Sequence, residues 1–195
     1  MNQALTTIAQ VVVTIFGLFG GFLTDIVPWE LKQFGFAHGF IGFISLCILI
    51  GIKFITTYVT NVRARSVALL IGFLIGAATF VYKGSDYLRT LDKWAFRYGG
   101  ESGQLYLAGS ELTDLGKSEV DRAGSELDST DHLSLVFHFT IDPERDKGVI
   151  WTARSLEQIE DSLRLDYSIT VLSIVLALGC GIEALYKRKR GSESA

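Results

Sequence analysis

Two long apolar runs of this sequence are separated by only six residues, Asn61 to Ser66 (NVRARS), and two of the six are arginines. A run of about 20 apolar residues is long enough to cross the hydrocarbon core of a bilayer as a helix. Loops rich in Lys and Arg stay on the cytoplasmic side, because moving their charges across a membrane is costly. The short gap is therefore predicted to be a cytoplasmic loop between two transmembrane helices.

Apolar runs along the whole chain predict an α-helical membrane protein with four transmembrane helices. The runs cover Leu5–Val27, Gly39–Thr60, Val67–Tyr82 and Tyr167–Tyr186. The first lacks the basic start and the A-x-A-like cleavage site of a secretory signal, so we expect it to be retained. The third is short, but Leu88, Leu91, Trp94 and Tyr98 continue its helical spacing. Residues 1–82 are thus expected to hold the first three transmembrane helices.

The largest basic cluster of the chain follows the last apolar run, residues 167–186. It is Lys187-Arg188-Lys189-Arg190, at the start of the tail 187–195. The rule applied to the loop also places this tail in the cytoplasm. With four helices the N-terminus is then cytoplasmic as well, and residues 83–166 lie on the opposite side. In a bacterial inner membrane that side is the periplasm.

Residues 83–166 form a hydrophilic and acidic insertion between the third and fourth predicted helices. They contain ten Lys and Arg against seventeen Asp and Glu, a net charge of −7. Nucleic-acid binding requires a basic surface, so we expect no direct binding of nucleic acid. Cys47 and Cys180 both lie in apolar runs, so no disulfide framework is indicated in the insertion.

Local patterns predict a small extramembrane α+β domain for this insertion. Gln104–Ala108 reads as a short strand, and Thr113–Leu127 as a loop with at most a turn of helix. Apolar residues alternate with polar ones from Leu133 to Ile141, which is the period of a half-buried strand. A turn over residues 142–148 then predicts a hairpin with Val149–Thr152.

A helix is predicted to follow that hairpin and to continue into the last transmembrane run. Ser155 and Gln158 have the spacing of a capping box, and Leu156, Ile159 and Leu163 share one helix face. No Pro or Gly interrupts the sequence before Tyr167. One continuous helix would couple the extramembrane domain mechanically to the bilayer.

No constellation in the sequence supports catalysis, and we expect no enzyme, no cofactor and no metal site. On the predicted strand, His132 and His138 would lie about 20 Å apart at 3.3 Å per residue, too far to share a metal ion. His38 stands alone in the connection after the first run. The glycine-rich turn Gly99–Gly103 lacks the Gly-Lys-Ser/Thr ending of a phosphate-binding loop.

Two charged residues lie inside predicted transmembrane helices, Lys53 in the second and Glu183 in the fourth. Both lie at a comparable depth, so an intramembrane ion pair is one interpretation. The alternative is that the long Lys53 side chain reaches the headgroups by itself. Gly72 and Gly76 form a small-xxx-small pair, which lets two helices approach closely within the chain or between copies.

The basic residues at the predicted cytoplasmic edge are candidates for contacts with a partner protein. They are Arg63, Arg65, Lys187, Arg188, Lys189 and Arg190. The run Lys187–Arg190 is first explained as an anchor that stops translocation, and binding to anionic lipid is a further alternative for it.

The layout resembles the membrane subunit of the Kiwa antiphage defence system, KwaA. The resemblance is carried by the gap Asn61–Ser66, the insertion 83–166 and the basic tail Lys187–Arg190. It implies a homo-oligomer, such as a tetramer, that senses phage attachment at the envelope and works with a cytosolic DNA-binding partner, KwaB. It provides no motif from which site residues could be transferred.

Two other classes remain open for such a chain. One is a pore-forming membrane effector of a nucleotide-signalled defence system, whose soluble domain must meet its ligand in the cytoplasm. The predicted topology and the charge of −7 argue against that class, because the charge would repel an anionic ligand. The other is an envelope scaffold unrelated to defence.

Overall fold

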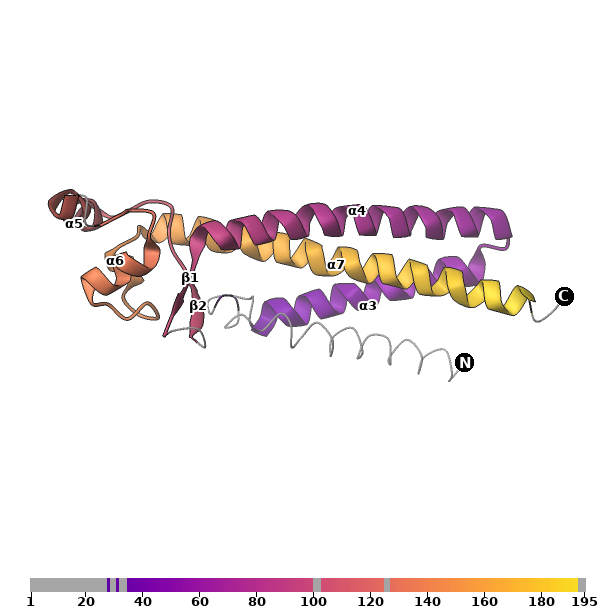
Figure 1. Cartoon of the computed structure of the whole chain (residues 1–195). Coiled ribbons are helices and arrows are strands. Elements are labelled where there is room, and N and C mark those ends of the chain that lie inside the picture. Colours follow the sequence, from indigo (N-terminus) through magenta and orange to yellow (C-terminus); the bar gives the residue numbers. More distant parts are fainter. Residues whose placement is uncertain (1–27, 29–30, 32–34, 100–102, 125–126, 193–195) are drawn as a thin grey trace. The chain divides into compact units, whose positions relative to one another are not determined.

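The computed structural model describes residues 28, 31, 35–99, 103–124 and 127–192 of the 195-residue chain (Figure 1). The predicted first span, Leu5–Val27, lies outside the described residues. Contacts divide the chain into two units. We call Gly35–Tyr87 with Leu165–Ala195 the helical unit, and Leu88–Arg164 of the other unit the lobe.

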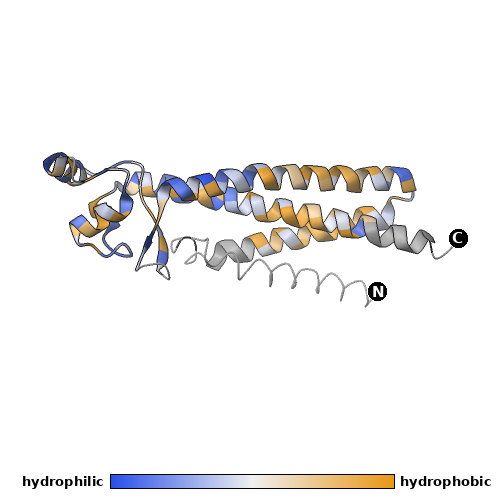
Figure 2. Ribbon diagram, viewed as in Figure 1, coloured by the Kyte–Doolittle hydropathy of each residue, from blue (hydrophilic) through white to orange (hydrophobic). Residues whose placement is uncertain are grey.

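The helical unit contains α3 (Gly35–Tyr58) and large parts of α4 (Val62–Trp94) and α7 (Ala153–Ser192). These three helices have both the length and the apolar composition needed to cross a membrane. Figure 2 shows mostly orange, apolar residues along the middle parts of the α4 and α7 ribbons. Three of the four predicted transmembrane runs therefore lie in helices of this kind, and the chain has the composition of a helical membrane protein.

Glycines of α4 allow its backbone to approach α7 closely. A Cβ atom at Gly76 would lie 2.7 Å from the backbone nitrogen of Ala177 and 2.7 Å from the carbonyl oxygen of Ser173. At Gly72 it would lie 2.7 Å from the Sγ of Cys180. The small-xxx-small pair of the sequence thus packs two helices of the same chain together.

The lobe combines a two-stranded antiparallel sheet with short helices. Its elements are β1 (Ala95–Tyr98), β2 (Gln104–Leu107), α5 (Asp114–Ala123), α6 (His132–Phe139) and the 3-10 turn η2 (Lys147–Val149). In the sheet, Phe96 pairs with Tyr106. The predicted strand at 104–108 is present, but the helical extension of α4 ends at Trp94, so Tyr98 lies in a strand.

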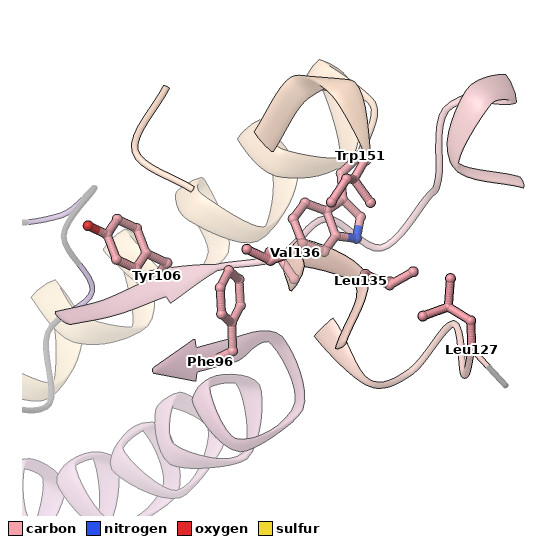
Figure 3. Packing of buried hydrophobic residues seen from close by; sticks show 8 residues of the cluster. Phe96, Tyr106, Leu127, Leu135, Val136 and Trp151 are labelled. Carbon is pink, nitrogen blue, oxygen red and sulfur yellow. The ribbon is translucent and has the colours of Figure 1, made fainter. Parts of the chain in front are cut away.

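Aromatic and aliphatic side chains from the sheet, α6 and the segment before α7 form the core of the lobe. Figure 3 shows Phe96, Val136 and Trp151 close together, with Tyr106 on one side of them and Leu135 on the other. The rings of Phe96 and Trp151 are 5.9 Å apart between centroids. Burial of a side chain of this size contributes about 1.5–3 kcal/mol, so this cluster holds the lobe together.

The strand predicted at Leu133–Ile141 is wrong, because these residues form the helix α6. Leu135 and Val136 are both fully buried, whereas Phe137 is exposed. A strand would bury Leu135 and Phe137 on one face, but a helix buries adjacent positions together with the residues three and four away. Asp131 caps the helix by accepting a 3.1 Å hydrogen bond from the Ser134 backbone N–H. Capping by Asp131 therefore favours a helix over the strand that the alternating pattern predicts.

The predicted hairpin between that segment and Val149–Thr152 is absent for the same reason. Trp151 instead forms an isolated antiparallel bridge with Leu112. The hairpin of the lobe is β1–β2. His132 and His138 accordingly lie on one short helix rather than along a strand, and the distance of about 20 Å expected for an extended chain does not apply.

The loop predicted at Thr113–Leu127 contains a ten-residue helix, α5. Thr113 caps it by accepting a 3.0 Å hydrogen bond from the Gly116 N–H. Gly116 does not break the helix; a Cβ atom there would lie only 2.7 Å from the carbonyl oxygen of Ile150. Gly124, with a φ of 60°, ends the helix. One glycine thus serves close packing and the other serves termination.

α7 is one unbroken helix of 40 residues, as the absence of Pro and Gly before Tyr167 predicts. Its start differs from the predicted capping box, because the helix begins at Ala153. The Oγ1 of Thr152 accepts a 3.3 Å hydrogen bond from the Ser155 N–H. Ser155 is therefore inside the first turn and buried, and Thr152 is the capping residue.

Replacing Asp131 by alanine is expected to destabilise the lobe by about 1 kcal/mol, the usual effect of losing an N-terminal cap. Hydrogen bonds from the Ser134 hydroxyl and backbone N–H hold the pKa of Asp131 below its ordinary value. The stabilisation is therefore present above the unfolded pKa of about 4 and is lost as pH falls through the lower folded pKa. Thermal unfolding followed by tryptophan fluorescence measures it, since Trp94 and Trp151 both contact His132 of α6.

The control for this prediction is Asp131→Asn. Asparagine keeps a capping oxygen but cannot titrate, so this variant should have nearly wild-type stability at neutral pH. Its stability should also change less than that of the wild type below about pH 4. If alanine and asparagine variants unfold at the same temperature, the cap is not what selects the helix.

Candidate functional site

An ion pair joins α3 and α7 inside the helical unit. The Nζ of Lys53 lies 3.0 Å from the Oε1 of Glu183, and the two side chains are 38% and 16% exposed. The structure thus brings together the two charged residues that the sequence singles out within the apolar runs. The second carboxylate oxygen, Oε2, is buried and has no hydrogen-bond partner among the described residues.

Close packing of α3 against α7 positions this pair. Gly179 lies one turn before Glu183 on α7, and a Cβ atom there would lie 2.8 Å from the Cδ1 of Ile52 and 3.0 Å from the Cδ2 of Leu49. Ile52 directly precedes Lys53. The absence of a side chain at Gly179 therefore lets α3 come close enough for a lysine and a glutamate to meet.

Partial burial makes the pairing of these charges important. An isolated carboxylate or ammonium group is expensive in an apolar environment, and the cost is recovered only when a partner is present. Glu183 is the more buried of the two and already has one oxygen without a partner. Loss of Lys53 would leave its carboxylate without the only described ion-pair partner.

The predicted basic residues lie just beyond this ion pair along the helices. α3 ends at Tyr58, five residues after Lys53, and Lys187 follows Glu183 by four residues on α7. At 1.5 Å per residue these positions are about 6–8 Å beyond the pair. Arg63 and Arg65 follow the turn after α3, so they lie at the same end of the helical unit as positions 187–190 of α7. We call the end formed by these six residues the basic end.

Arg63 and Arg65 have different surroundings at the basic end. The Nη1 of Arg65 donates a 3.4 Å hydrogen bond to the carbonyl oxygen of Thr56, in the last turn of α3. There its positive charge complements the negative end of the helix dipole. Arg63 is exposed. Of the two arginines predicted to contact a partner, Arg65 is thus engaged within the chain and Arg63 faces outward.

The outer surface of α4 is apolar along most of its length. From Val62 to Tyr82 the helix is about 30 Å long, which matches the hydrocarbon thickness of a bilayer. Its exposed large apolar residues in this stretch are Val62, Val67, Leu70, Ile71, Phe73, Leu74, Ile75, Phe80, Val81 and Tyr82. Such a surface is suited to contact with lipid.

A second ion pair, which the sequence analysis missed, joins α4 and α7 at the other end of this apolar stretch. The Nζ of Lys83 lies 2.8 Å from the Oδ1 of Asp166 and 3.7 Å from the Oδ2 of Asp86. The available signal was that Lys83 is the first charged residue after one apolar run and Asp166 the last before the next. Adjacent antiparallel helices bring such flanking residues to the same level.

The described residues do not form a group of three or more His, Cys, Asp or Glu side chains that could hold a metal ion. His132 contacts the carbonyl oxygen of Lys93 through its Nε2 at 3.1 Å, and its ring stacks on Trp94. His138 lies 3.8 Å from Glu119. Both histidines thus make contacts within the lobe.

The fold and the site together define a class: a helical membrane protein with a small mixed lobe and an ion pair between two of its apolar helices. No protein-family model matches the chain, and no curated protein or solved structure is detectably similar to it.

Proposed function

We propose that this chain is a bacterial inner-membrane sensor of antiphage defence. In this proposal it forms a homo-oligomer, its lobe faces the periplasm and detects an envelope event such as phage attachment, and its cytoplasmic side recruits or regulates a cytosolic DNA-binding partner. The resemblance in layout to the membrane subunit of the Kiwa system supports the defence role and suggests a partner such as KwaB. The four-span topology expected from the sequence, with Leu5–Val27 as the first span, is part of this proposal.

The continuity of α7 is the observation that carries this proposal. Near its beginning the helix is anchored in the lobe, where Ser155 and Leu163 are buried. Without interruption it then provides Glu183 to the ion pair and continues through positions 187–190. A helix that is packed at one end and charged at the other is a direct path by which a change in the lobe reaches the opposite side of a membrane.

The proposed orientation follows from the charges at the two ends of the helical unit. The basic end has Arg63, Arg65 and the run 187–190, which favour the cytoplasm. The other end has Lys83 with the two carboxylates of Asp86 and Asp166, and it leads into an acidic lobe. This asymmetry supports a periplasmic lobe.

Cysteine labelling tests the orientation and thereby the sensor role. In a background with Cys47 and Cys180 replaced by alanine, cysteines at Ser110 and Ser129, both exposed in the lobe, should react with an impermeant maleimide on intact spheroplasts. The matched control is Ala64→Cys, exposed at the basic end, which should react only after lysis. Gel-shift or mass measurement of the modified chain gives the result.

The reverse labelling pattern would place the lobe in the cytoplasm. A lobe there could not meet an arriving phage, whereas it could bind a soluble nucleotide signal. The pore-forming effector would then be the better assignment, and the sensor proposal would be abandoned.

A further inference from the structure

The basic end has a surface that is continuous with the apolar outer face of α4. Arg63 is exposed, and the residues four, seven and eleven positions later on the same helix are Val67, Leu70 and Leu74. Residues at these spacings share one helix face. All three apolar side chains are exposed. Arg63 therefore terminates a face suited to lipid contact, at the level where headgroups begin.

The other basic residues of this end, at positions 187–190, are consecutive on α7 and so do not share one side of the helix. α7 remains helical through Ser192, so positions 187–190 lie on its last turns. Successive residues of an α-helix are about 100° apart, and four consecutive positions are distributed around the whole circumference. A single docking face for a protein would place its charges three or four residues apart. Four consecutive basic positions on a helix instead match headgroups, which surround the helix.

Arg65 shows that the basic residues of this end are not equivalent. Its guanidinium is used inside the chain, on the carbonyl oxygen of Thr56 at the end of α3. It is only partly exposed, unlike Arg63. The start of α4 thus contains a second arginine, Arg65, that is engaged within the chain and can serve as an internal control.

We infer that the basic end is a binding surface for anionic phospholipid headgroups, formed by Arg63 and the run Lys187–Arg190. Arginine donates in a fork that fits phosphate oxygens, and a lysine or arginine near an anionic surface strengthens attraction about fivefold. The exposed apolar face of α4 next to Arg63 would contact the acyl chains of the same lipid. This assignment is independent of the sensor role, because it requires only that these helices lie in a bilayer.

Competition between two lipids that differ only in charge tests this assignment. The full chain, purified in a neutral detergent, is mixed with equal amounts of phosphatidylglycerol and phosphatidylcholine with identical acyl chains. Native mass spectrometry then measures the ratio of the two lipids bound. The wild type should prefer phosphatidylglycerol, Arg63→Gln should lower the ratio about fivefold, and glutamine at all four positions 187–190 should lower it further. Added salt should reduce the preference as well.

Arg65→Gln is the matched control and should leave the lipid ratio within about twofold of the wild type. Because both lipids compete in one sample, partial loss of folded protein does not change the ratio. Equal binding of the two lipids by the wild type, or equal losses at Arg63 and Arg65, would overturn the assignment. So would a glutamine variant that keeps the lipid ratio but loses a co-purifying cytosolic protein, because the basic end would then be a protein-docking surface.

Discussion

Replacing Gly76 by alanine is expected to force α4 and α7 apart. The new methyl group would lie 2.7 Å from two backbone atoms of α7, the nitrogen of Ala177 and the carbonyl oxygen of Ser173. Backbone atoms cannot rotate away as the end of a flexible side chain can, so the helices themselves must shift. Overpacking of this kind costs about 1–3 kcal/mol.

Cys180 provides the measurement for this variant. It is a free and buried cysteine of α7, one turn beyond Ala177 and two turns beyond Ser173, on the face that packs against α4. In a Cys47→Ala background, a membrane-permeant maleimide should label Cys180 about 5- to 100-fold faster in Gly76→Ala than in the parent, if labelling follows local opening.

Gly51→Ala is the matched control, because it adds the same methyl group to a helix glycine with no atom within 4 Å of the new position. It should leave labelling of Cys180 unchanged or slow it slightly, since alanine favours helix by up to about 1 kcal/mol. Equal labelling rates for the two variants would show that the close contact of α4 and α7 does not form.

Replacing Lys53 by methionine is the second change with a large expected effect. Methionine keeps the length of the side chain but removes the ammonium group that lies 3.0 Å from Glu183. Removing one partner of a fully buried pair costs about 3–5 kcal/mol. Lys53 is 38% exposed, so the pair is only partly buried and we expect a smaller loss of about 1–3 kcal/mol here. The same labelling of Cys180 measures the loss.

The double variant Lys53→Met with Glu183→Gln separates the charge from the packing. Glutamine removes the unpaired carboxylate, so the double variant should recover most of the stability that Lys53→Met loses. A strictly additive double variant would mean that the two side chains do not interact. In that case Lys53 would reach the headgroups alone, as the alternative interpretation of the sequence holds.

The sequence predicts the helical unit well because its elements depend on one dominant property. Long apolar runs give α3, the apolar part of α4 and the last part of α7. The ends of α3, Gly35 and Tyr58, lie within a few residues of the predicted ends. The Lys53–Glu183 contact could be anticipated, because two charges at equal depth in apolar runs have few other partners.

The lobe was harder to predict because its short elements are selected by capping and packing. From Leu133 to Ile141 the alternating pattern is genuine, yet positions 132, 135, 136 and 139 also follow helical spacing. Asp131 decides between the two by capping a helix. α5 was not predicted because its sequence is rich in acidic residues and contains glycines. The contact between Gly116 and Ile150 is not visible in the sequence.

The Lys83–Asp166 contact was missed for a different reason. Its two residues are far apart in the sequence, and only the pairing of α4 with α7 brings them together. Knowledge that these two helices are neighbours would have sufficed to predict it.

Because α4 and α7 each belong to both the helical unit and the lobe, the lobe has no natural cut points. A fragment confined to residues 88–164 would begin within one helix and end within another, leaving backbone carbonyl and amide groups at both cuts without their partners. During biosynthesis, insertion of the apolar part of α4 precedes the lobe in the chain, and α7 completes both units at once. We therefore expect a fragment confined to the lobe to fold poorly without the flanking parts of α4 and α7.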